Sequence, residues 1–208
     1  MPEVKEQIDY HDNGQIKERC LLKDGKLDGE AISYDETGRI IQKAHFKDGK
    51  LDGETIIYDE NGSIAQKIDF KNGRIDGQLI IYGAGKVRME LLYKNGARDG
   101  ESIVYDEAEQ IVEKSSYKDG KLNGDSFWFG KNGKPVKKSH YLDGKLNGET
   151  IVYYPNGGVQ ERSHYKDDKL DGEVVRYSED GKVKEKLYFK DGKPQPVPKQ
   201  SPQGPVRR

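Results

Sequence analysis

The sequence is short of the residues that build a conventional globular core or a covalent framework. Hydrophobic residues make up only 32% of its 208 positions, against 35% charged residues. Its single cysteine, Cys20, excludes an intramolecular disulfide framework and any zinc site made of thiolates alone. No apolar run approaches the roughly 18 residues of a membrane-spanning helix. A conventional two-layer globule is therefore poorly supplied with core residues.

A targeting signal and an excess of charge of either sign are also missing. The first ten residues, MPEVKEQIDY, lack the apolar stretch of a signal peptide. We therefore expect a cytoplasmic protein as the sequence is written, or a periplasmic or exported one if a leader was removed. The 36 basic and 37 acidic residues leave a net charge of −1, which gives no case for a general nucleic-acid-binding protein.

What the sequence does contain is an internal repeat. A segment that reads KDGKLDGE, or a close variant of it, recurs seven times. Its second glycine recurs at intervals of 24, 24, 23, 24, 24 and 24 residues, at Gly29, Gly53, Gly77, Gly100, Gly124, Gly148 and Gly172. We therefore expect a lead-in at residues 1–9, a repeat array at 10–192 and a tail at 193–208. The tail holds five prolines and four basic residues without an acid, and it is predicted to be disordered.

Each repeat alternates turn chemistry with short β-type runs, as in GEAISY, DETG, RIIQKAHF and KDGKLDG. Asp-Gly and Asn-Gly pairs accept positive φ angles, and the branched and aromatic residues between them favour strands. The pattern predicts an all-β fold, an elongated single twisted antiparallel sheet of stacked β-hairpins with about seven repeats of 24 residues. The glycines serve turns rather than a phosphate-binding loop, because no GxxxxGK[ST] or GxGxxG segment opens a helix.

Counting every second residue assigns the side chains to the two faces of such a sheet. Ile32 and Tyr34 share a face before the hairpin tip, and Ile40, Ala44 and Phe46 share a face on the return strand. Equivalent residues recur in the other repeats, so we expect all these columns to stack on one side as an apolar face. The apolar residues are too few for a globular core, but they are numerous enough to cover one face of such a sheet.

The repeat unit reads Tyr-x3-Gly, then β-branched residues, then an aromatic residue followed by Lys-Asp-Gly-Lys-Leu-Asp-Gly-Glu. Over residues 10–192 it resembles the variant MORN repeat of bacterial proteins, and within these the MORN-repeat-variant antitoxin family. That resemblance implies an antitoxin or immunity protein without a catalytic centre. Resemblance to the wider MORN family implies lipid binding, membrane-associated scaffolds and dimerisation. The departures concentrate in the third and fourth repeats, where the tip at 82–85 is one residue short.

Residues with catalytic or metal-binding chemistry follow the repeat and form no constellation of their own. His45, His140 and His164 occupy one column, in which neighbouring repeats are about 9.5 Å apart, too far to share one ion directly. The acids that follow the second loop glycine recur as repeat elements and not as an acid–base pair. Ser139 beside His140 lacks a nucleophile-elbow context. We therefore predict no catalytic residue, no metal site and no cofactor, and that the protein is not an enzyme.

Two further columns are candidates for a partner-binding surface. The basic column contains Lys43, Lys67, Lys114 and Lys138. We expect an apolar column beside it on the same face, made of Ile57, Ile81, Val104, Trp128 and Val152. Trp128 is the only tryptophan and lies between two phenylalanines, so it has the contact area of an interface anchor. The alternative interpretation is that these residues only favour strands and solubility.

A regular scaffold with a partly apolar face indicates a binding role. We predict a non-catalytic protein that binds a protein partner, a bacterial toxin or effector, and neutralises it by steric occlusion. The alternative is a lipid or membrane-surface scaffold that uses the basic column and the basic tail. The net charge of −5 over residues 1–192 argues against this alternative. The sequence leaves the oligomeric state open.

Overall fold

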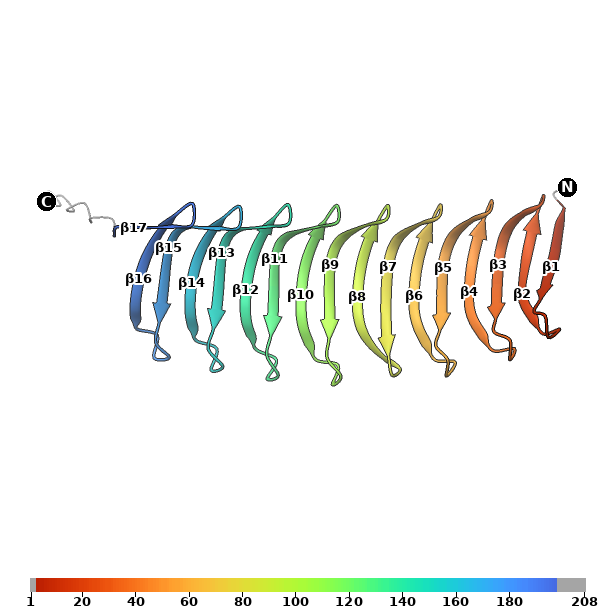
Figure 1. Cartoon of the computed structure of the whole chain (residues 1–208), viewed down its shortest axis with the longest axis horizontal. Helices are drawn as coiled ribbons and strands as arrows, with labels where there is room; N and C mark the ends of the chain where they lie inside the picture. Colours follow the sequence, from red (N-terminus) through yellow and green to blue (C-terminus); the bar gives the residue numbers. More distant parts are fainter. Residues whose placement is uncertain (1–2, 198–208) are drawn as a thin grey trace, which may run out of the picture. The chain divides into compact units, whose positions relative to one another are not determined.

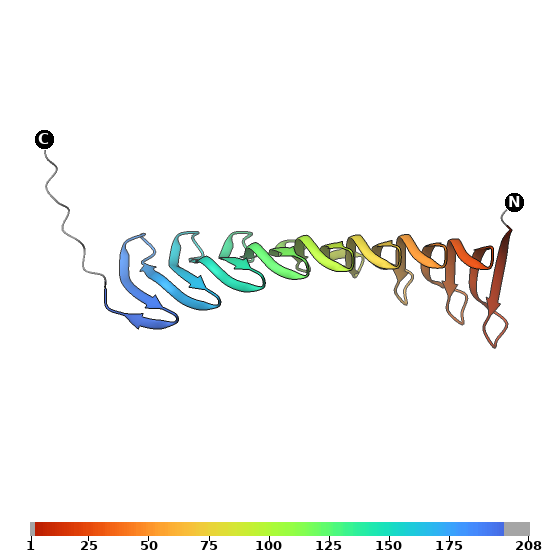
Figure 2. The same cartoon turned by 90° about the horizontal axis from the view of Figure 1, so that it is seen from above.

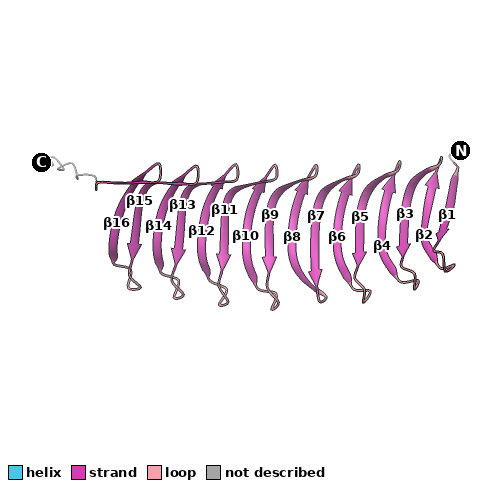
Figure 3. Ribbon diagram, in the orientation of Figure 1, coloured by secondary structure: helices cyan, strands magenta, loops and turns pink. Residues whose placement is uncertain are grey.

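The 17 β-strands of the computed structural model account for most of residues 3–197, the part of the chain that the structure describes. Loops and turns join the strands (Figure 3). Because residues 3–197 contain no helix, they contain none that could cross a membrane. The chain divides into two units, residues 1–122 and 123–208, and each is described by itself.

In the first unit each strand pairs antiparallel with the next strand in the sequence, so that consecutive hairpins lie side by side (Figure 1). The strands of this unit are β1 (Val4–Tyr10), β2 (Ile16–Lys23), β3 (Lys26–Tyr34), β4 (Ile40–Lys47), β5 (Lys50–Tyr58), β6 (Ile64–Lys71), β7 (Arg74–Gly83), β8 (Lys86–Lys94), β9 (Ala97–Tyr105) and β10 (Ile111–Lys118).

The second unit repeats the same antiparallel pairing in sequence order. Its strands are β11 (Lys121–Phe129), which begins two residues before the unit, β12 (Pro135–Leu142), β13 (Lys145–Tyr153), β14 (Val159–Lys166), β15 (Lys169–Tyr177), β16 (Val183–Lys190) and β17 (Lys193–Gln195). Seen from above, the strands are curved rather than flat (Figure 2). The prediction of an all-β fold built from antiparallel, repeated hairpins is therefore confirmed in both units.

The short turns that connect one hairpin to the next follow from the Asp-Gly and Asn-Gly pairs. A two-residue turn that matches the twist of its strands needs positive φ at both central residues. Asp24 and Gly25 meet this requirement with φ angles of 49° and 76°. At the equivalent turn of a later repeat, Asp168 replaces the glycine and still adopts a φ of 66°. The turn geometry is therefore kept where its most favourable residue is absent.

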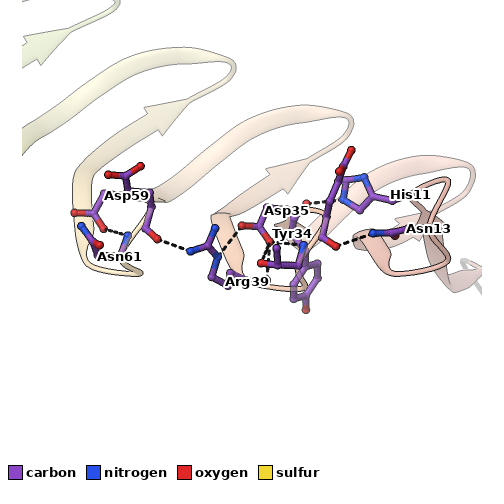
Figure 4. Close-up of polar contacts among 10 residues, drawn as sticks. His11, Asn13, Tyr34, Asp35, Arg39, Asp59 and Asn61 are labelled. Carbon is purple, nitrogen blue, oxygen red and sulfur yellow. Dashed lines mark hydrogen bonds and ion pairs between the residues drawn. The ribbon is translucent and has the colours of Figure 1, made fainter.

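The longer turns at the hairpin tips are closed by a carboxylate. Asp35 accepts hydrogen bonds from the backbone N–H groups of Thr37 at 2.9 Å and Arg39 at 3.0 Å (Figure 4). The Thr37 hydroxyl also donates to Asp35, and these bonds together hold the pKa of Asp35 well below its ordinary value. Such a local side-chain bond to the backbone defines the turn without the help of a core.

Side chains also join each tip to the tip of the next repeat. Asn13 donates from Nδ2 to the carbonyl oxygen of Glu36 at 2.8 Å, and Arg39 donates from Nη1 to that of Glu60 at 2.7 Å (Figure 4). Successive hairpins are thus held together at the tips as well as by their strand ladders.

At the other end of the hairpins, the second aspartate of the KDGKLDGE segment joins neighbouring loops in the five segments that carry it. The Asp76 carboxylate accepts a hydrogen bond from the Asn95 N–H at 2.9 Å, in the turn that follows one repeat later. Asp99 likewise lies 2.7 Å from the Lys118 ammonium group. The hydrogen bond from Lys118 is the main reason that the pKa of Asp99 lies below its ordinary value. This contact between neighbours gives the repeated motif a structural role.

Strand pairing shows that the predicted face assignment is wrong. Ala31 lies opposite Ala44, whereas Ile32 lies opposite Lys43, so the Ile32 and Ala44 columns lie on opposite faces. The reason is a bulge at each tip, where the register shifts between Ser33 and Tyr34. One extra residue on the return strand reverses every assignment that is counted from the tip. We call the side with Ala31, Ala44 and their equivalents the small-residue face, and the side with Ile32, Tyr34, Lys43 and their equivalents the tyrosine face.

On the tyrosine face of the second unit, Ile151 and Val175 are buried. Along the small-residue face of each unit, the buried residues form one row. In the first unit they are Cys20, Ala31, Ala44, Thr55, Ile68, Leu91, Ser102 and Ser115, and in the second Ser126, Ser139, Thr150, Ser163 and Val174. The predicted apolar core is therefore only partly right: much of the buried row in the second unit carries hydroxyl groups.

Both ends of the repeat array differ in detail from the sequence-based bounds. Val4–Tyr10, most of which falls in the predicted lead-in, forms β1 and pairs with β2. Lys193–Gln195, at the start of the predicted tail, forms β17 and pairs with β16. Residues 198–208 of the tail lie outside the described residues.

Candidate interaction surfaces

The structure separates the two columns that the sequence placed side by side. Lys43 lies opposite Ile56, whereas Ile57 lies opposite Gln42. Because successive residues of a strand point to opposite faces, the basic column lies on the tyrosine face and the apolar column on the small-residue face. The expectation that they form one surface is wrong, and the tip bulge is again the cause. The candidate partner-binding residues therefore belong to two distinct surfaces.

The basic column of the tyrosine face is largely neutralised by neighbouring acids. Lys114 Nζ lies 3.1 Å from Glu101, and Lys138 Nζ lies 2.7 Å from Asp125. The hydrogen bond to Asp125 raises the pKa of Lys138. Equivalent ion pairs join Arg162 to Glu149 at 2.9 Å and Lys186 to Glu173 at 3.0 Å. The acids that follow the loop glycines are thus cross-strand partners of the basic column, which explains why both recur. Lys43 and Lys67 lie in the same column, on either side of Ile56.

The histidines and serines that could carry catalysis are kept apart by the strand geometry. His140 Nδ1 lies 2.7 Å from Asp125, but the neighbouring Ser139 is fully buried on the other face of the sheet. Ser139 instead accepts a hydrogen bond from the Thr150 hydroxyl at 3.1 Å. Among residues 3–197, no three His, Cys, Asp or Glu side chains come together as a metal site would require. In the described structure, His140 and Ser139 each contact a side chain of a neighbouring strand, Asp125 and Thr150.

The apolar column forms a row across the small-residue face of the first unit. Ile57 lies opposite Gln42 and Gln66, and Ile81 lies opposite Gln66 and Met89. Val104 continues the row opposite Met89. We call the six residues Gln42, Ile57, Gln66, Ile81, Met89 and Val104 the uncharged row. Its side chains are all partly exposed, so it offers a neutral, largely apolar strip.

In the second unit the equivalent row contains Trp128 and Val152, which flank Lys137. The Lys137 ammonium group lies 4.9 Å from the centre of the Trp128 ring, within the range of a cation–π contact. Phe127 and Phe129, the neighbours of Trp128, stack with ring centroids 6.4 Å apart. The tryptophan itself is partly exposed, which leaves its ring accessible to a partner.

A hollow that the sequence did not reveal lies further along the second unit. Its volume is about 320 Å³, and its lining includes Val152, Tyr154 and Arg176. The Tyr154 hydroxyl donates to the Tyr177 carbonyl oxygen at 2.8 Å, a contact between neighbouring tips. Arg176 is held between two carboxylates, with Glu161 at 2.9 Å and Glu185 at 2.7 Å. Tyr154 stands where most other tips carry aspartate or a small residue. This difference between the repeats is the one sequence feature that could have indicated the hollow.

Two wider hollows lie between loops of the first unit and are lined mainly by charged side chains. One, of about 490 Å³, is bordered by Lys71, Arg74 and Lys94 together with Asp76. The other, of about 500 Å³, is bordered by four lysines and two aspartates. They arise because the Lys-Asp-Gly-Lys turns of consecutive repeats stand next to each other.

Stacked hairpins whose loops and tips contact the next repeat define a β-hairpin repeat protein. The MORN repeat variant model matches residues 3–24, 27–48, 51–72, 98–119, 146–167 and 170–191, which is more than half of the chain. The chain therefore belongs to the MORN repeat variant family. The first matched segment includes β1, so the repeat begins before the lead-in boundary at residue 9.

Other comparisons add little about function. No curated protein matches the chain. A crystal structure of TcdB2-TccC3-TEV matches with a TM-score of 0.24 and 10% identity, over 88% of this chain and 12% of that chain. A crystal structure of TcdB2-TccC3-Cdc42 matches with a TM-score of 0.18 and 14% identity, over the same shares. The chain thus spans about an eighth of the length of these structures, and similarity at this level carries no argument about its role.

Proposed function

We propose that this chain is a non-catalytic repeat protein that binds a partner protein on the small-residue face of the first unit. The observation that carries the proposal is the uncharged row. Six consecutive positions, one on each of six neighbouring strands, carry no charge, in a chain of which 35% of residues are charged. A contiguous, partly exposed apolar strip bordered by polar residues is typical of a protein interface.

The partner that we propose is a bacterial toxin or effector, neutralised by steric occlusion. The resemblance of the repeat to the variant MORN repeats of antitoxins supports this choice. A ladder of hairpins presents a long, preorganised surface, and such a surface can cover an active site without chemistry of its own. Lipid binding through the basic column is less favoured, because four of its members are paired with carboxylates.

The experiment is a co-expression rescue combined with a pull-down of the product of the neighbouring gene. We expect Ile57→Lys with Ile81→Lys to abolish capture and rescue, because two charges would be buried against the partner. The matched control is Lys43→Glu with Lys67→Glu, which changes two charges on the opposite face and should leave capture intact. If no neighbouring product is toxic and none binds, the antitoxin role fails. If binding is lost with the control and kept with the isoleucine variant, the proposed face is wrong.

A further inference from the structure

We propose that the hairpin formed by β11 and β12 is a second docking site of the same partner, and that it binds an acidic segment of that protein. Trp128 serves as the apolar anchor, and Lys131, Lys134 and Lys137 supply the positive charge. This inference rests on the proposed function, because it assumes a protein partner. It adds the chemistry that the partner must present.

The charge of this hairpin departs from that of the other repeats. At the position of Lys137, other strands carry Glu18, Gln42, Gln66, Met89, Glu113, Glu161 or Glu185. At the position of Lys131, other tips carry an acid in five repeats, as in Glu36 and Glu60. The repeat that contains the only tryptophan is thus also the one in which both positions have become lysine. The family model matches on either side of this segment but leaves residues 120–145 unmatched.

The positive charges of the hairpin are not cancelled from within it. Residues 123–142 contain four lysines and a single acid, Asp125. Asp125 is occupied on the tyrosine face by Lys138 and His140, each 2.7 Å away. Lys137 lies over the Trp128 ring, and the Lys134 ammonium group donates to the Asn156 carbonyl oxygen at 3.4 Å. Lys131 and Lys134 stand exposed at the tip.

An acidic peptide segment fits this arrangement better than a nucleic acid. An aromatic ring bordered by lysines combines an apolar anchor with charge that steers and orients a partner of opposite sign. The cationic area ends after one hairpin, because Val152 follows Lys137 and the next cation, Arg176, is held by two glutamates. A regular row of phosphates would need cations that continue from repeat to repeat. The described residues of this unit carry no such continuous row of cations on the small-residue face.

The test uses the full chain and the emission of its single tryptophan. The probe is a synthetic twelve-residue peptide of Glu and Asp with one central Phe, and its control replaces every acid with the matching amide. We expect the acidic peptide to shift the Trp128 emission and to bind at least about tenfold more tightly than the amide peptide, with an affinity that falls as salt is added.

Two matched variants locate the site. Lys131→Glu with Lys134→Glu and Lys137→Glu should abolish binding of the acidic peptide. Lys23→Glu with Lys47→Glu and Lys71→Glu makes the same charge change on loops of the first unit and should leave it intact. Circular dichroism of both variants checks that the strands remain. Equal binding of the two peptides, or equal loss with both variants, overturns the proposal. So does tighter binding of double-stranded DNA or of phosphatidylserine vesicles than of the acidic peptide at equal salt.

The capture experiment with both sets of variants distinguishes a failure of this second site from a failure of the proposed function. Loss of partner capture with the isoleucine variant, but unchanged capture with the Lys131, Lys134 and Lys137 variant, would support the uncharged row and refute the second site. Loss with both variants supports both. If the acidic peptide binds at Trp128 but no neighbouring gene product is captured, the hairpin's preference for an acidic segment stands, whereas its role in docking a toxin and the antitoxin role are both refuted.

Discussion

Asp99 accepts a charge-assisted hydrogen bond from Lys118, and the 2.7 Å contact between them joins the loops of two consecutive repeats. Asp171 and Lys190 form the same contact at 3.0 Å in the second unit. A repeat protein is stabilised by contacts between neighbours rather than by one central core. These pairs are therefore part of what couples one hairpin to the next.

The first prediction is a loss of stability in acid that depends on these aspartates. The pKa values of Asp99 and Asp171 are lowered, chiefly by the hydrogen bonds from Lys118 and Lys190. A lowered folded-state pKa means that the contribution is complete above the ordinary value of 3.8 and is lost as the pH falls through the folded-state value.

We expect the double variant Asp99→Asn with Asp171→Asn to unfold at a lower temperature than the wild type at pH 6. The difference should narrow as the pH falls below the ordinary value of 3.8 and through the lowered folded-state pKa, because the wild-type carboxylates then become neutral as well. Thermal unfolding followed by circular dichroism between pH 2 and 7 measures this. A constant difference at every pH would mean that the charges of these aspartates do not matter.

The second prediction concerns a buried hydroxyl. Ser126 is fully buried, and its Oγ has no hydrogen-bond partner in the described structure. Removing a buried polar atom that lacks a partner costs nothing in bonding, so Ser126→Ala should raise the free energy of unfolding by up to about 1 kcal/mol. Ser126→Leu, at the same site, should lower it by about 1–3 kcal/mol, because a much larger side chain would replace a serine that is already fully buried. Urea unfolding compares the two, and destabilisation by alanine would show that the hydroxyl is satisfied.

The third prediction concerns a glycine inside strand β7. Gly77 has a φ of 128°, and a Cβ added there would lie 2.6 Å from the Asp69 carboxylate. That carboxylate accepts the Gln78 N–H at 2.9 Å, so the side chain cannot move away without losing a hydrogen bond. Gly77→Ala should therefore lower the free energy of unfolding by on the order of 3 kcal/mol.

Gly62 provides the control for this substitution. Its φ is 78°, and an added Cβ meets nothing within 4 Å. Gly62→Ala should cost only about 1–2 kcal/mol, the strain of the left-handed conformation. Equal losses at Gly62 and Gly77, measured by urea unfolding, would contradict the steric argument.

The fourth prediction concerns Cys20, which is only 4% exposed. Burial is the main cause of its raised pKa, so the reactive thiolate is both scarce and inaccessible in the folded state. We expect a thiol reagent such as a disulfide dye to react at least about a hundredfold faster in denaturant than with the native protein. Rapid reaction of the native protein at neutral pH would show that β2 opens easily.

The sequence predicted the elements better than it predicted their faces. Glycine spacing and Asp-Gly pairs predicted the hairpins of the repeat array, because turn geometry depends on a few adjacent residues, but strands β1 and β17 at its ends were missed. Faces depend on register, and the extra residue opposite Ser33 and Tyr34 leaves no clear mark in composition. The same register error affected the candidate binding surface. The apolar and basic residues do form two columns, but the sequence-based prediction put both columns on one face of the sheet. The hollow beside Tyr154 is lined by residues of four strands, β13 to β16, and no local sequence pattern shows that these residues come together.

The bulge at each tip has a consequence for how this chain can change over time. It places the uncharged row on one side of the sheet and the ion-paired column on the other, so substitutions that alter the first do not disturb the second. The surface residues of one hairpin can then differ from those of its neighbours, as in the Trp128 hairpin, while the strand pairing stays the same. A scaffold with this separation can follow a changing partner without refolding.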